Sequence, residues 1–189
     1  MIRTTLFLSL VLMFSGCDDP AATADETGPA PTPAELFACD TGQFAISKPL
    51  VGPGFDPAKG GVLGEPQPTY VVHATQLFLR PERLAEFQAI ADPVSAQLDQ
   101  TEGLLAYSYA GDTGCYEAAT LGIWTSEAAL YKFVGSGAHA AAMGQASDVG
   151  YTGRLTHWTV TADELAAIDW PAARARLASV DPSAAFPDY

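Results

Sequence analysis

Residues 69–160 alternate between strand-like and helix-like patterns in the order β-α-β-β-α-β, and this order most constrains the fold. Residues 69–79 are rich in β-branched and aromatic side chains, which is typical of a strand. Apolar residues then recur at helical spacing, and a Gly-Asp-Thr-Gly turn at 111–114 joins two further strands. A second helical stretch precedes a last strand at 151–160. The order predicts an α+β, ferredoxin-like domain, one face of whose sheet is covered by two helices.

Turn and capping residues set the expected element boundaries. Pro81 suits the first turn of the first helix, and Pro93 is expected to kink that helix. Ser126 is expected to cap the second helix. Beyond the domain, Thr161 should cap a short helix and Pro171 should open a last one. The two middle strands are predicted at 103–110 and 116–124, and a further helical piece at 137–146.

Both faces of the first predicted strand are apolar. One phase carries Val71, Leu77 and Leu79, and the other carries Val72, Ala74 and Phe78. Two helices cover only one face, so the second face needs a partner. The simplest partner is a second copy, and we expect a homodimer through the sheet face.

The first seventeen residues resemble a bacterial lipoprotein signal peptide. Arg3 precedes an apolar run that is too short to span a bilayer comfortably. The run ends in Phe-Ser-Gly-Cys, so Cys17 is the expected lipidation site. The alternative is ordinary secretion with cleavage after Ala24. We therefore expect a chain in the cell envelope, lipid-anchored to a bacterial membrane and facing the periplasm.

The remaining segments are read from composition. Residues 18–35 are rich in Pro, Ala and Thr, which predicts a disordered tether. Residues 36–68 contain many Gly and Pro and are expected to form an irregular extension. Residues 161–189 form a predicted C-terminal helical tail. The formal charge of -13, from 22 acidic and 9 basic residues, argues against nucleic acid as a partner.

Export also bears on the two remaining cysteines. In an oxidising compartment Cys39 and Cys115 are expected to pair, and the alternative is two free buried thiols. No CxxC, HExxH or Cys/His cluster occurs in the sequence, so we expect no metal. We likewise predict no cofactor.

Four segments carry a family resemblance: LFLRPERLAEF, EGLLAYSYAGD, ATLGIWTSEAALYKFVGSGAHAAAM and GRLTHWTV. Together they resemble the antibiotic-biosynthesis-monooxygenase-like group of dimeric α+β barrels. The resemblance covers about residues 69–160. It implies two subunits that pack their sheets into a barrel, with a pocket between sheet and helices in each subunit. Members of the group include cofactor-free monooxygenases, haem-degrading enzymes and proteins without known activity.

The haem-degrading branch of that group uses an Asn, a Trp and a ligand His. Aligned by eye, these fall at Thr75, Phe133 and Met143, and none matches. Haem degradation by that route is therefore not expected, although His139 lies near enough to keep haem binding as an alternative.

Three histidines are the candidate catalytic residues: His139, His73 and His157. His139 lies in a charge-free run and could act as a base or ligand, or simply be a hydrogen-bonded residue at a helix junction. His73 and His157 lie on neighbouring strands, where they could bound a pocket or be structural. The candidate substrate-pocket residues are Trp124, Tyr107, Tyr109, Phe133 and Arg154, each with core packing or a surface ion pair as the alternative.

The leading functional hypothesis is a cofactor-independent monooxygenase that acts on a small aromatic or quinol-like substrate. In such chemistry the deprotonated substrate itself reduces oxygen, so the protein must deprotonate, orient and exclude water. The alternative is a non-catalytic periplasmic lipoprotein that binds a small apolar ligand or serves as a scaffold.

Overall fold

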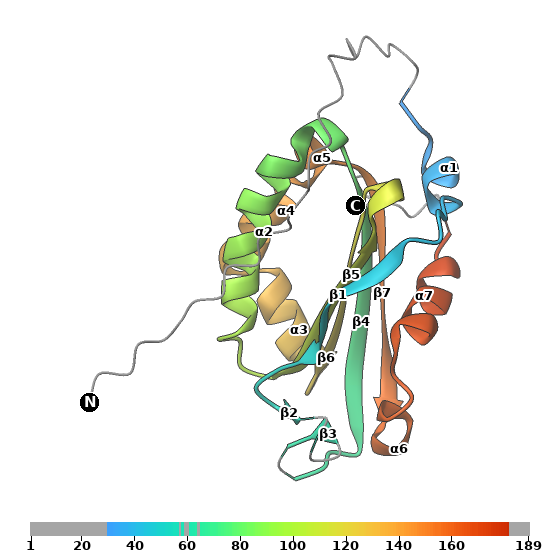
Figure 1. Cartoon of the computed structure of the whole chain (residues 1–189). Coiled ribbons are helices and arrows are strands. Elements are labelled where there is room, and N and C mark those ends of the chain that lie inside the picture. The colour runs from blue at the N-terminus through green and yellow to red at the C-terminus, as the bar shows by residue number, and fades with distance from the viewer. Residues whose placement is uncertain (1–29, 57, 59–60, 64, 182–189) are drawn as a thin grey trace, which may run out of the picture.

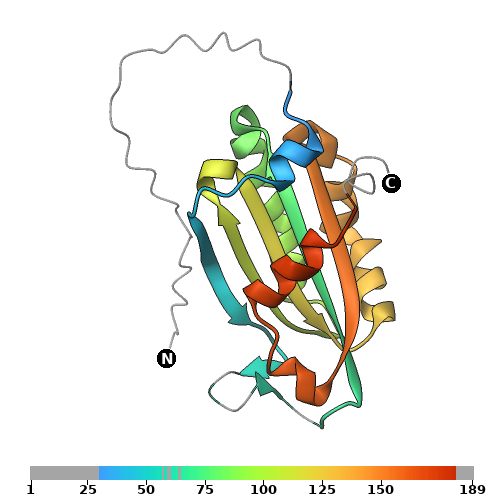
Figure 2. The same cartoon turned by 90° about the vertical axis from the view of Figure 1, so that its right-hand side faces the viewer.

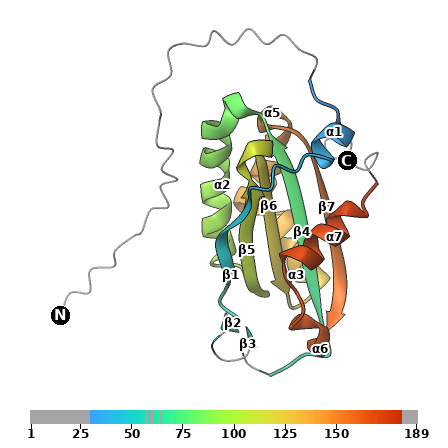
Figure 3. The ribbon, with the colours of Figure 1, turned by 45° about the vertical axis from the view of Figure 1, so that its right-hand side comes forward.

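An antiparallel sheet forms the centre of the computed structural model, which describes residues 30–56, 58, 61–63 and 65–181. Four strands make its core: β4 (Thr69–Leu79), β5 (Leu104–Asp112), β6 (Glu117–Trp124) and β7 (Gly150–Thr161). Figure 1 shows the sheet nearly edge-on, with helices on either side of it, and Figure 3 shows its strands in the order β5-β6-β4-β7. This is the order of a ferredoxin-like βαββαβ unit, so the predicted fold class is confirmed. The predicted signal peptide and Cys17 lie outside the described residues.

A fifth strand was not expected from the sequence. β1 (Phe44–Val51) pairs antiparallel with β5 and forms one edge of the sheet (Figure 3). It lies inside the segment 36–68, so that segment is not an irregular extension throughout. The same region contains the short β2 (Phe55–Asp56) and β3 (Gly61–Val62), which pair with each other. A helix, α1 (Pro33–Phe37), already begins within the predicted tether 18–35.

One face of the sheet is covered by the helices that connect its strands. They are the 3-10 turn η2 (Pro81–Arg83) followed by α2 (Leu84–Leu98), then α3 (Glu127–Val134), α4 (Gly137–Met143) and α5 (Ala146–Val149). Ser126 caps α3 as predicted, because its hydroxyl accepts the Ala129 N–H. Val71, Trp124 and Phe133 are buried in the core between these helices and the sheet. No helix in the described part of the chain is both long and apolar enough to cross a membrane.

The opposite face of the sheet is covered by helices that precede and follow the core strands in sequence. α7 (Trp170–Ala178) lies diagonally across it, and α6 (Ala162–Leu165) and α1 flank α7 (Figure 2). Trp170, at 5% exposure, packs with buried Val72 and Ile123 in one core cluster. The prediction that this face is open is therefore wrong. The sheet face through which a homodimer was expected is already covered by α7. The tail supplies the apolar cover that was assigned to a second copy.

A disulfide fixes the N-terminal segment to the domain. Cys39 and Cys115 are bonded across a sequence separation of 76 residues. Beside the bridge, the Thr41 N–H and hydroxyl donate to the buried carboxylate of Asp112. These contacts join the end of α1 to the turn between β5 and β6.

Candidate functional site

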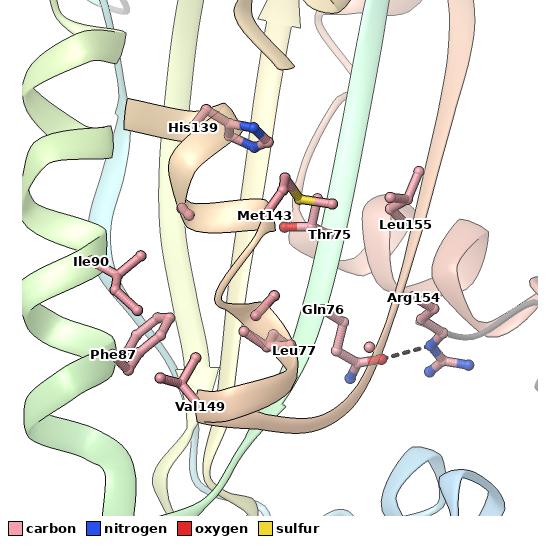
Figure 4. Close-up of a pocket in the computed structure, with 13 residues that line it drawn as sticks. Thr75, Gln76, Leu77, Phe87, Ile90, His139, Met143, Val149, Arg154 and Leu155 are labelled. Atoms are coloured by element: carbon pink, nitrogen blue, oxygen red, sulfur yellow. Dashed lines mark hydrogen bonds between the residues drawn. The ribbon is translucent and has the colours of Figure 1, made fainter. Parts of the chain in front are cut away.

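An apolar cavity of about 180 Å³ lies between the helices and the sheet. Phe87 and Ile90 of α2 form one wall, and Met143 of α4 faces Leu155 of β7 across the cavity (Figure 4). The remaining lining residues are Thr75, Gln76, Leu77, His139, Ala142, Ala146, Val149, Gly153 and Arg154. Met143 and Leu155 are both exposed to solvent, at 39% and 40%, so the cavity opens between α4 and β7.

His139 contributes an imidazole ring to the lining of this cavity. Its ring nitrogen Nδ1 lies 3.1 Å from the Val134 carbonyl oxygen. Because a carbonyl oxygen only accepts, Nδ1 carries the proton in the neutral ring and Nε2 keeps its lone pair. The ring packs on Phe133, with 4.5 Å between the ring centroids. Nε2 is therefore the nitrogen of this ring that can accept a hydrogen bond.

The apolar surroundings keep His139 neutral. Burial lowers the pKa of His139 below its usual 6.5, and the hydrogen bond to Val134 opposes that shift only in part. The imidazole is therefore uncharged at neutral pH. It can accept a proton from a ligand, but the resulting imidazolium would be poorly solvated.

Other polar residues at the cavity differ in where their side chains point. The Thr75 side chain projects from β4 toward the helices (Figure 4). Gln76 and Arg154 touch the cavity but point away from it, and Arg154 Nε donates to Gln76 Oε1 at 2.6 Å. The Arg154 guanidinium lies over the Phe37 ring, 4.4 Å from its centroid. Arg154 was predicted as a pocket residue, but its guanidinium lies on the opposite face of the sheet, where it contacts Gln76 and Phe37.

His73 has a structural position in the core. It is 8% exposed, and its Nδ1 accepts the indole N–H of Trp124 at 2.7 Å. Burial, followed by the charges of His139 and His157, lowers the pKa of His73 to about 4. A Cβ on Gly122 would lie 2.3 Å from the His73 ring, so the glycine makes room for the imidazole. His73 does not line the cavity, contrary to the prediction of a catalytic role there.

His157 lies directly opposite His73 in the β4–β7 pairing, so the two side chains share a face of the sheet. Its Nε2, however, lies 3.3 Å from a Glu127 carboxylate oxygen and 3.4 Å from the Tyr131 hydroxyl. Both partners belong to α3. The three histidines are neighbours, but the described residues around the cavity include His139 alone of the three.

The predicted aromatic pocket residues form the core beside the cavity rather than its wall. Trp124 and Tyr107 are buried, at 0% and 1% exposure. The Tyr107 hydroxyl donates to Asp99, and the Tyr109 hydroxyl pairs with Ser95 at 2.9 Å. Phe133 packs against the His139 ring. Of the eight candidate residues, His139 and Arg154 line the cavity. The Arg154 side chain points away from it, so His139 is the one candidate left to bind a ligand there.

Sequence reasoning missed most of the true lining. Phe87 and Ile90 are spaced as core residues of a helix, and nothing in that spacing distinguishes a cavity wall from packed core. Met143 of α4 and Leu155 of β7 are 12 residues apart in sequence, and the fold places both at the cavity. The charge-free run around His139 was the one usable signal.

The structure is an α+β domain of the ferredoxin-like type. β1 extends its sheet at one edge, and α7 covers one face of that sheet. No protein-family model matches the chain, and the search of curated proteins finds no match. Solved structures do match. One is named an antibiotic biosynthesis monooxygenase, with 16% identity, a TM-score of 0.44, and coverage of 47% of this chain and 95% of that one.

Two further neighbours are similar in kind. A Pseudomonas aeruginosa protein matches with 14% identity and a TM-score of 0.45. The match covers 52% of this chain and 100% of the Pseudomonas aeruginosa chain. A Fusobacterium nucleatum protein, named as a proposed monooxygenase, has 12% identity and a TM-score of 0.48. The match to it covers 62% of this chain and 52% of that one, so this chain spans about half its length. The likeness to each of these neighbours is one of fold, over roughly half of this chain.

Proposed function

We propose that the chain binds a small, single-ring aromatic molecule whose hydroxyl group donates a hydrogen bond to Nε2 of His139. One arrangement carries the proposal: His139 lines a mostly apolar cavity, and the contact of its Nδ1 with the Val134 carbonyl leaves Nε2 as the acceptor of the ring. An apolar ring would displace water from the walls, and the hydroxyl would satisfy the nitrogen.

The size of the cavity limits the ligand. A dry protein cavity of about 150 Å³ holds one benzene ring, and this cavity measures about 180 Å³. One ring with one or two small substituents therefore fits. Drug-sized ligands need roughly 300–1,000 Å³, and haem is at least as large, so haem binding at His139 is disfavoured.

The reaction that suits this arrangement is oxygenation without a cofactor. His139 Nε2 takes the hydroxyl proton, and the phenolate places negative charge on the para carbon. That carbon gives its electron pair to molecular oxygen, which forms a carbon–oxygen bond, and the peroxide recovers the proton from His139. Loss of water, including the para hydrogen, leaves a quinone carbonyl. One oxygen atom enters the product and the other leaves as water.

Turnover of phenol or a substituted phenol by the purified protein tests this reaction. We expect quinone formation in air and none under nitrogen. His139→Ala should lower the rate by about 100-fold or more, the range in which general bases contribute. His157→Ala, which alters a histidine outside the cavity, is the matched control and should keep the wild-type rate. Equal turnover by wild type and His139→Ala would rule out the assigned base.

A second function, binding without catalysis, is favoured by the lowered pKa of His139, because burial also makes the imidazole a weak base. The two functions give different results with the same ligand. Binding alone predicts saturable, His139-dependent phenol binding with no oxygen-dependent product.

We also propose that the chain is an envelope lipoprotein modified at Cys17. The Phe-Ser-Gly-Cys sequence supports the lipid anchor, and the Cys39–Cys115 disulfide suits an oxidising compartment. Incorporation of an alkyne-labelled fatty acid in a bacterial host is expected for the wild type and absent from Cys17→Ser. A label that persists in that variant would contradict the anchor.

A further inference from the structure

The side chain of Gln97, in the last turn of α2, links α2 to the start of α4. Its Oε1 accepts the backbone N–H of His139 at 2.9 Å. Its Nε2 donates to the Ser136 carbonyl at 3.1 Å. Donor and acceptor of the same amide are both used, so its orientation is fixed. Turning the amide over would place like groups against each other at both contacts.

Gln97 takes the place of a local helix cap. Ser136 is the N-cap residue of α4, but its side chain makes no capping hydrogen bond. Its hydroxyl is directed instead to the Phe133 carbonyl, at 3.5 Å. The N–H of the third helical residue, His139, would normally be satisfied by such a cap. A side chain from a different helix supplies that bond here, so α4 is held at a set place relative to α2.

The backbone at Gly137 is shaped to admit this amide. Gly137 has a φ of 57°, in the left-handed region that favours glycine. A Cβ added there would lie 2.9–3.2 Å from the three amide atoms of Gln97. Residue type and backbone conformation at position 137 therefore both serve the close approach of Gln97.

We propose that Gln97 is a positioning residue that fixes the His139 imidazole at the cavity. Gln97 holds the backbone of His139, and the Val134 carbonyl holds its ring. The distance from Nε2 to the α2 wall, formed by Phe87 and Ile90, then depends on the Gln97 contact. The expected effect of Gln97 on ligand binding rests on the proposed function. The position of the His139 ring does not depend on it.

Two substitutions separate this role from simple packing. Gln97→Met keeps the size of the side chain and removes both hydrogen bonds, whereas Gln97→Glu keeps the acceptor for His139 and loses the donor. Gln88→Met is the matched control, because Gln88 of the same helix bonds to Asp92 at an exposed site. For each protein, NMR titration gives the pKa of His139, and a phenol titration gives the dissociation constant.

We expect Gln97→Met to weaken phenol binding about fivefold to tenfold, the equivalent of one ordinary hydrogen bond. The His139 pKa should rise toward its usual value as the ring becomes hydrated. Gln97→Glu should bind phenol more tightly than Gln97→Met, and Gln88→Met should match the wild type. Should Gln97→Met not fold, Gly137→Ala displaces the same amide and should give the same two changes.

A wild-type His139 pKa in Gln97→Met would overturn the proposal, whatever the ligand result. If the wild type itself binds no phenol, the proposed function fails, yet the pKa comparison still decides whether Gln97 positions the imidazole.

Discussion

Trp170→Ala is expected to destabilise the protein by about 3–5 kcal/mol, the usual cost of truncating a buried tryptophan. Trp170 is 5% exposed and begins the helix that covers the second sheet face. Its indole N–H donates to Ser108 Oγ at 2.9 Å, and its ring meets Phe44 edge-on at 5.6 Å between centroids. Both contacts and the apolar burial disappear together. Thermal unfolding should show a midpoint lower by roughly 10 °C or more.

Trp158→Ala is the matched control for this prediction. Trp158 lies on the same face but is only partly buried at the edge of the cluster. Its truncation should cost clearly less than that of Trp170. Equal losses would mean that α7 is not the main cover of the sheet. Exposure of Val72 and Ile123 in Trp170→Ala should also promote self-association, which size-exclusion chromatography would detect.

The second large effect concerns the disulfide. Replacing Cys39 and Cys115 together by alanine should lower the free energy of unfolding by about 4 kcal/mol, because the bridge closes a long loop in the unfolded chain. The sequence separation it spans is 76 residues. Denaturant unfolding of the double variant, compared with the oxidised wild type, measures the loss.

The reduced wild type is the natural control, since it lacks the bond but keeps both sulfur atoms. It should fall near the double variant. If the double variant unfolds at the wild-type denaturant concentration, then the contacts of Thr41 with Asp112 hold the N-terminal segment without help from the bridge.

The four core strands and their connecting helices could be predicted because their side-chain periods match their structures. Ser126 and Thr161 mark helix starts through capping, which needs no tertiary information. β1 was missed because its exposure does not alternate cleanly and Pro49 interrupts it. α7 was expected as a helix, but its short, alanine-rich sequence gave no sign that it would cover the sheet.

Of the candidate site, the sequence predicted one residue correctly, His139 at the cavity. The lack of charge around His139 pointed to a buried imidazole, but its free nitrogen follows from the Val134 contact, which is a tertiary fact. His73 was misjudged because its partner, Trp124, lies 51 residues away on β6. Histidine on a strand looks the same in sequence whether it binds a ligand or an indole.

The central claim is that the cavity binds a phenol through Nε2 of His139, and a titration followed by the ring nitrogen signals of His139 tests it most directly. Anisole, which has the ring but no donor, is the matched probe. We predict saturable phenol binding that shifts the Nε2 signal and is about tenfold tighter than anisole binding, as one well-made hydrogen bond allows.

The pH dependence has a definite sign. Because burial lowers the pKa of His139, Nε2 remains an acceptor down to pH values below 6.5, the usual histidine pKa. Phenol affinity should stay constant from pH 8 to that point and fall only when His139 gains its proton in more acidic solution. An unshifted Nε2 signal, or equal affinity for phenol and anisole, would contradict the account.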